Sequence, residues 1–137
     1  MPIKVHIDKS KDLTVFTVKG LLSFDDAMPV VKAFYDGSPT KHVIWDMTDT
    51  TEVQFTSEEV INIATFEPRI GGKRALGKTA FVAQKDVLFG LSRMFEIHSG
   101  MVNSPYPVMV FRSIEQAYKW LDEPYTIQLH HMPVQDL

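Results

Sequence analysis

Residues 72–79 spell G-x-x-x-x-G-K-T, the letter pattern of a loop that binds nucleotide phosphates. In such a loop the backbone amides and the lysine hold the phosphates, and the loop must follow a strand and open a helix. Here a helical pattern comes before the segment, and the apolar run of residues 79–83, typical of a buried strand, comes directly after it. We therefore interpret the match as accidental and expect no bound nucleotide or other cofactor.

Carboxylates gather at the end of another apolar run, residues 42–46. Asp46, Asp49 and Glu52 lie at or just beyond that end, where α/β folds tend to place ligands. Divalent-metal binding or acid–base chemistry is one interpretation. No second cluster supplies a nucleophile or a base, so we favour the other interpretation, in which Asp46 and the threonine-rich loop around Thr48 satisfy backbone amides in turns. We assign no metal ligand and no catalytic residue.

Two hydroxyl residues, Thr56 and Ser57, stand at a predicted helix start. Thr56 with Glu59 three residues later forms a capping box, and Phe55 against Val60 forms the accompanying hydrophobic staple. Helix amides that point outward also suit an anion, so Thr56 and Ser57 are a candidate phosphorylation or anion site. The structural alternative is that Thr56 simply caps the helix.

Basic and aromatic residues give a second candidate surface. Residues 69–78 hold four of the fourteen basic residues, among them Lys73 and Arg74, in a glycine-rich segment. Such a segment could receive a phospholipid headgroup or an acidic partner, or be only a solvated connection. Phe89 lies off the core stripe of its predicted helix, near Arg93, and an exposed aromatic there could mark a partner surface or the entrance for an apolar ligand.

The composition is that of one globular domain. The 137 residues are 45% hydrophobic and 23% charged, and the net charge of −3 argues against general nucleic-acid binding. The absence of cysteine removes disulfides and thiolate chemistry and fits a reducing cytoplasm. No apolar run approaches the roughly 20 residues that span a bilayer, so we expect a soluble cytoplasmic protein without a transmembrane segment.

Strand and helix patterns alternate along the chain. Period-two alternation predicts a hairpin of strands at residues 3–7 and 13–18, with Ile3, Val5 and Ile7 on the buried face. Short apolar runs predict strands at 42–46, 79–83 and 108–111. The 3.6-residue period predicts four helices, which we place at residues 26–36 after a cap at Ser23 or Asp26, 56–66, 86–98 and 113–121. We expect residues 47–55 to form a polar loop.

These elements predict the fold class and the domain limits. An N-terminal hairpin followed by alternating helices and strands favours a mixed, mostly parallel central α/β sheet of about five strands. We expect one domain over residues 1–122. Residues 123–137 form a C-terminal tail in which Tyr125, Ile127 and Leu129 alternate with polar residues, so the tail could be an extra strand or a docking arm.

Three stretches resemble the SpoIIAA-like proteins of the STAS superfamily, which includes anti-sigma factor antagonists and is similar in fold to CRAL-TRIO lipid-binding domains. They are residues 78–83, the helix with Phe95, and residues 108–121 with their strand–Phe–Arg–Ser–x–x–x–Ala–x–x–Trp–Leu ending. Residues 46–49 look like the first half of the regulatory signature of the superfamily. Residues 54–57 stand in place of the second half without its Asp and Gly, and Thr56 or Ser57 corresponds to the phosphorylated serine.

The resemblance implies a non-enzymatic regulatory module that binds another protein, and a homodimer is a further expectation. The alternative is a carrier or sensor of a small apolar or lipid-like ligand. It would use aromatic- and methionine-lined space beneath the helix of residues 86–101. Asp46, Thr48, Asp49, Lys73, Arg74, Phe89 and Arg93 are the candidate ligand or partner surface.

Overall fold

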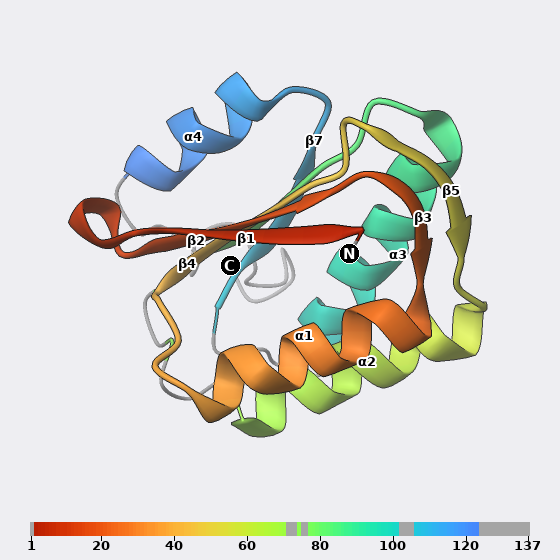
Figure 1. Ribbon diagram of the computed structural model, residues 1–137, viewed down its shortest axis with the longest axis horizontal. Helices are drawn as coiled ribbons and strands as arrows, with labels where there is room; N and C mark the ends of the chain where they lie inside the picture. The colour runs from red at the N-terminus through yellow and green to blue at the C-terminus, as the bar shows by residue number, and fades with distance from the viewer. Residues whose placement is uncertain (1, 71–73, 75–76, 102–105, 124–137) are drawn as a thin grey trace, which may run out of the picture.

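The computed structural model (Figure 1) describes residues 2–70, 74, 77–101 and 106–123. Its main sheet has five strands in the order β1-β2-β4-β6-β7. The strands are β1 (Ile3–Asp8), β2 (Leu13–Val18), β4 (His42–Asp46), β6 (Thr79–Val82) and β7 (Val108–Phe111). In this sheet β1 and β2 pair antiparallel, as a hairpin joined by a short 3-10 turn at Lys9–Lys11, and the other neighbours are parallel. This confirms the predicted mixed, mostly parallel sheet.

Helices cover both faces of the sheet. Helices α1 (Phe24–Asp36), α2 (Ser57–Ile70) and α3 (Asp86–Met101) lie on one face and α4 (Ile114–Asp122) on the other (Figure 1). Strand β4 serves both cores, because Val43 and Trp45 pack on the α1 side while Ile44 packs with Ala117 of α4. The unbroken apolar run of β4 is thus the mark of a strand buried on both sides.

A second, two-stranded sheet corrects the prediction of a polar loop. Strand β3 (Gly20–Ser23) pairs in parallel with β5 (Thr50–Gln54), whereas the sequence indicated a loop over residues 47–55 and no strand at residues 20–23. Thr50 is fully buried and its hydroxyl donates a 3.1 Å hydrogen bond to the Val18 carbonyl. Most residues of β5 are polar, and the strand pairs with a segment about thirty residues away. Its sequence therefore carries no local pattern that would predict a strand.

Two apolar stripes are also corrected. Val5 and Ile7 are 54% and 55% exposed, because β1 is the edge strand and only Ile3 is buried in the core beside α1. The 3.6-residue period of residues 86–98 predicts a buried stripe of Val87, Leu91, Met94, Phe95 and His98 in α3, but Val87 is 72% exposed and Leu88 is buried. The buried face of α3 is therefore rotated by one residue at its first turn.

Candidate functional site

The start of α2 carries the predicted capping box. The Thr56 amide donates to Glu59 Oε1 at 2.9 Å, and the Glu59 amide donates to Thr56 Oγ1 at 3.1 Å. The side chains of Thr56 and Ser57 are exposed. The cap is confirmed, and it occupies two amides that an anion would otherwise use. A phosphorylation or anion site at these residues stays a prediction.

The Asp46 carboxylate stabilises the turn that follows β4. Asp46 Oδ1 accepts hydrogen bonds from the Thr48 amide at 3.1 Å and the Thr48 hydroxyl at 2.6 Å. Asp49 is exposed, and its carbonyl accepts from the Gly20 amide at 3.1 Å, which joins the loop to β3. Among the described residues no cluster of three carboxylates or imidazoles could hold a metal ion. Asp46 and Thr48 therefore satisfy each other and the backbone, as we favoured.

Residues 77–79, which end the G-x-x-x-x-G-K-T match, each have a structural role. A Cβ atom on Gly77 would lie 1.9 Å from the Lys41 carbonyl oxygen, so only glycine fits this close approach. Lys78 Nζ donates to the carbonyls of Trp120 and Glu123 at 2.7 and 2.8 Å and so caps the end of α4. Thr79 is 2% exposed and begins β6. The segment opens a strand and not a helix, which confirms that the phosphate-loop match is accidental.

Arg74 corrects the proposed basic surface. Its side chain is 1% exposed, so it offers nothing to a headgroup or an acidic partner. The guanidinium donates to the carbonyls of Thr40, Lys41 and Lys78 and to the Tyr35 hydroxyl, at 2.8–3.2 Å. It also stacks 4.2 Å from the centre of the Tyr106 ring. Lys73 lies outside the described residues.

Sequence reasoning missed this buried cation because its partners lie far away in the chain. Arg74 joins the end of α1 through Tyr35 to the strand starts of β4 and β6. Next to it, His42 Nδ1 accepts from the Lys78 amide at 3.1 Å. Burial, with the positive charges of Arg74 and Lys78, lowers the pKa of His42 below its ordinary value. Burial likewise lowers the pKa of Lys78.

Helix α3 holds the remaining candidate residues. Phe89 is half-buried and the Arg112 guanidinium lies 4.0 Å from its ring centre, so the exposed aromatic that we predicted is covered. Arg93 is exposed and pairs with Glu96 at 2.6 Å. Glu96 also accepts from the Val110 amide at 3.1 Å. Burial raises the pKa of Glu96, and this effect outweighs the lowering by Arg93 and the Val110 amide.

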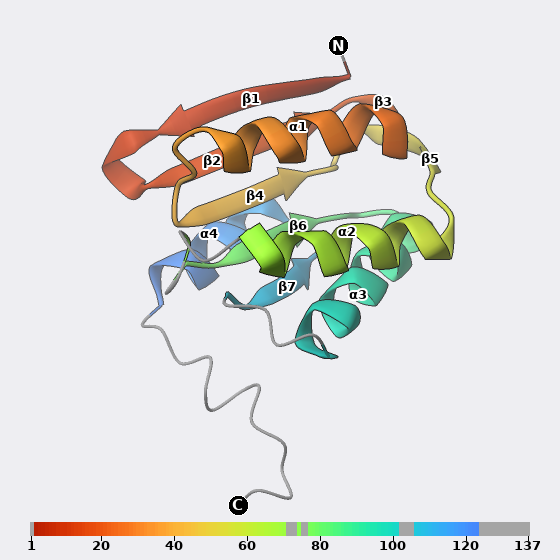
Figure 2. The ribbon, with the colours of Figure 1, turned by 90° about the horizontal axis from the view of Figure 1, so that it is seen from below.

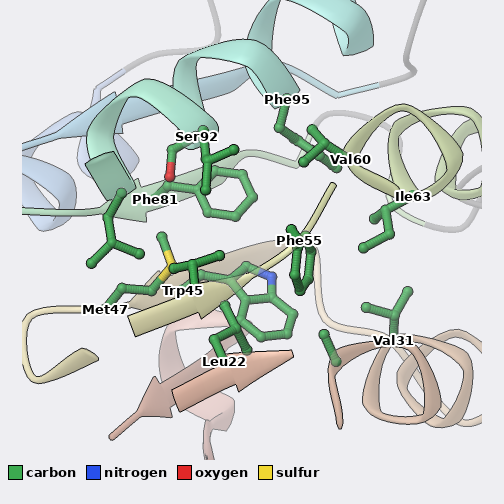
Figure 3. A pocket seen from close by; sticks show the side chains of 14 residues that line it. Leu22, Val31, Trp45, Met47, Phe55, Val60, Ile63, Phe81, Ser92 and Phe95 are labelled. Carbon is green, nitrogen blue, oxygen red and sulfur yellow. The ribbon is translucent and has the colours of Figure 1, made fainter. Parts of the chain in front are cut away.

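An apolar cavity lies between the helices and the sheet (Figure 3). Its volume is about 70 Å³, several times the roughly 10–15 Å³ that one water needs. Figure 3 shows Ser92 and Phe95 of α3 across the cavity from Leu22 and Val31. The rest of the lining is aromatic or aliphatic: Ala27, Trp45, Met47, Val53, Phe55, Val60, Ile63, Phe81, Leu88 and Leu91. The cavity occupies the space that the sequence indicated beneath α3.

No protein-family model matches the chain, and no curated protein sequence does. Among solved structures, an uncharacterised protein with a SpoIIAA-like fold from Shewanella loihica matches with a TM-score of 0.55 at 15% identity, over 87% of this chain and 93% of its own. The anti-sigma factor antagonist SpoIIAA in its unphosphorylated form matches at 0.54 and 10%, over 86% and 96%. An anti-sigma factor antagonist from Mycobacterium paratuberculosis matches at 0.52 and 13%, over 88% and 95%.

At sequence identities this low, the structural matches establish the fold of the chain but not its function. The chain therefore has a SpoIIAA-like fold, as the resemblance implied. Within the described residues, no helix is both long enough and apolar enough to cross a bilayer.

Proposed function

We propose that this protein is a non-enzymatic cytoplasmic regulator that acts by binding another protein. The support from comparison is a fold shared with two anti-sigma factor antagonists. The observation that carries the proposal is one exposed, acidic stretch at β5 and the start of α2. We call it the α2-start surface: Asp49, Glu52, Gln54, Thr56, Ser57 and Glu58, all exposed.

The charge of this surface points to the chemistry of the partner. Asp49, Glu52 and Glu58 carry three negative charges, against one positive charge on the exposed Lys19, which directly precedes the Gly20 amide that bonds the Asp49 carbonyl. A partner with a basic patch would be attracted to it and oriented by it. Phosphorylation of Ser57 would add about −1.5 to −2 charges at the helix start, where the dipole favours negative charge, and so change affinity without unfolding α2.

The test is a charge reversal with a matched control. Glu58 and Glu115 are both exposed and both lie second in their helices, α2 and α4. Immobilised wild-type protein and the Glu115→Lys variant should retain the same partner from a lysate of the source cells, in near-stoichiometric amount. The Glu58→Lys variant should retain much less of it. Equal retention by both variants, or no partner on the wild-type protein, would contradict the proposal.

A specific observation favours a second function, the binding of a small apolar ligand. The cavity is walled by apolar side chains with Ser92 as the polar exception, and such a site suits a hydrocarbon or short acyl group. Trp45 is in the wall and can report occupancy by its fluorescence.

Filling the cavity tests the ligand function. Ala27→Leu places three further carbons into the cavity from α1, where Leu suits a helix. We expect native mass spectrometry to find an apolar molecule on the wild-type protein and none on Ala27→Leu. We also expect the variant to unfold at a higher temperature, by about 0.5–2 kcal/mol of added stability. A ligand-free wild-type protein whose tryptophan fluorescence does not change on addition of short-chain fatty acids or small hydrocarbons would exclude this function.

A further inference from the structure

Strand β1 is an open edge of the main sheet. It pairs with β2 on one side, and among the described residues no strand pairs with its other side. Figure 2 shows β1 as the outermost strand, with no described element beyond it. An apolar open edge invites a further strand. Val5 and Ile7, both more than half exposed, give β1 that character.

The ladder between β1 and β2 fixes which backbone groups point outward. The Lys19 amide donates to the Pro2 carbonyl at 2.9 Å, so residue 2 faces β2. Because backbone direction alternates along a strand, Lys4, His6 and Asp8 also turn their amides and carbonyls to β2. Those of Ile3, Val5 and Ile7 therefore point away from the sheet, toward any strand that would add to it.

The side chains divide between the two faces in the same alternation. Val5 and Ile7 lie on the face of Ile3, and Lys4, His6 and Asp8 lie on the opposite face. Lys4 and His6 are exposed, and Asp8 is half-buried. Neither face of the outer part of β1 is covered by a described helix, so a second strand would meet no obstruction there.

We propose that β1 pairs antiparallel with β1 of a second copy of this chain, with His6 on the two-fold axis. In this register Val5 of each copy lies opposite Ile7 of the other, and their outward backbone groups form the hydrogen-bonded pairs. Lys4 of each copy lies opposite Asp8 of the other, in the pairs whose side chains approach most closely. The strand is therefore complementary to itself in both charge and hydrophobicity, as an interface with two-fold symmetry requires.

Neighbouring registers lack this complementarity. A register centred on Val5 would place Lys4 opposite His6 and leave Asp8 opposite Pro2. A register centred on Ile7 would pair His6 with Asp8 but place Lys4 opposite Ser10. The interface centred on His6 uses none of the six residues of the α2-start surface, so this proposal is independent of the proposed function.

A charge swap tests the register directly. Lys4→Glu places two acidic pairs across the axis, and Asp8→Lys places two basic pairs there. We expect the wild-type protein to show a concentration-dependent dimer in analytical ultracentrifugation. Each variant alone should dimerise at least about tenfold more weakly, because two attractive pairs become repulsive. An equimolar mixture of the two variants should form a heterodimer. In it the introduced glutamate of one chain faces the introduced lysine of the other, and the unchanged Asp8 and Lys4 face each other.

Asp8→Lys could disturb the hairpin, because Asp8 Oδ1 accepts a hydrogen bond from the Ser10 amide at 3.1 Å. A variant that changes only the backbone of β1 therefore serves as a second test. Val5→Pro removes an outward amide without touching the β1–β2 ladder, and proline is tolerated on such an edge. It should abolish the dimer and leave the melting transition of the monomer nearly unchanged, whereas Val5→Ala should retain dimerisation. A wild-type protein that is monomeric at every soluble concentration would overturn the proposal. So would a dimer unaffected by Lys4→Glu or by Val5→Pro.

Discussion

At the scale of single residues, the chain uses conspicuous side chains for structure. Gly77 admits the Lys41 carbonyl, Lys78 caps α4, and Arg74 bonds three carbonyls in the interior. Removing this guanidinium would take away the hydrogen bonds that it donates to the Thr40 and Lys41 carbonyls, whereas the Lys78 carbonyl also accepts from the Val43 amide. The residues that match a phosphate-binding loop in the sequence therefore connect the start of β6 to the start of β4 and to the end of α4.

Replacing Gly77 should be costly. Gly77→Ala puts a methyl group into the Lys41 carbonyl, and we expect a loss of about 2–3 kcal/mol in the free energy of unfolding. Gly90→Ala is the matched control, since a Cβ there has no atom within 4 Å and alanine favours the interior of α3. Urea denaturation should show Gly90→Ala to be neutral or more stable. Similar losses in both variants would contradict the close-approach argument.

His42 should make stability depend on pH. Its folded pKa lies below its ordinary value of 6.5, so the unfolded chain takes up a proton first as the pH falls. The stability contributed by neutral His42 is thus complete above pH 6.5 and is lost as the pH drops from 6.5 toward the lowered folded pKa.

In His42→Asn the amide oxygen can still accept from the Lys78 amide, but the side chain cannot be protonated. The difference in unfolding free energy between wild type and this variant should therefore shift in favour of the variant below pH 6.5. A difference that stays constant from neutral pH to about pH 5 would show that His42 is not held neutral by the fold.

At the scale of elements, the start of α2 is the part that the sequence predicted best. Thr56 and Glu59 form the expected capping box, and Phe55 packs against the apolar cluster that contains Val60. Each of these interactions spans only three to five residues. The same local reasoning correctly placed Ser113 at the start of α4, and Ser23, one of the two caps that it allowed for the first helix, is the cap of α1. It failed for β5 and for the exposed face of β1, where burial depends on which distant element lies alongside.

The cap at α2 can be measured. Thr56→Ala removes the acceptor for the Glu59 amide and should cost about 1 kcal/mol of stability. Ser57→Ala, one residue further into the helix, removes an exposed hydroxyl at a position where alanine is a good helix former, so it should cost little or nothing. Equal losses would indicate that both hydroxyls hold the helix start, contrary to the capping geometry.

At the scale of the whole molecule, the fold carries three separate features. The open β1 edge, the α2-start surface and the cavity between α1, α2, α3 and the sheet involve different residues. The fold could be predicted because strands and helices alternate along the chain with clear hydrophobic periodicity, and this local pattern agrees with the overall fold. Much of the candidate surface could not be predicted. Tyr106 covers Arg74 and Arg112 covers Phe89, and each covering residue lies 23 or more residues away in the chain.

We propose above all that the acidic surface at the start of α2 binds a basic protein partner. The most direct measurement is the affinity of that purified partner for wild-type protein, Glu58→Lys and Glu115→Lys over a range of salt concentrations. We predict that wild type and Glu115→Lys bind alike and weaken together as salt rises. Glu58→Lys should bind at least about tenfold more weakly at low salt. Identical affinities for all three proteins at every salt concentration would contradict the account.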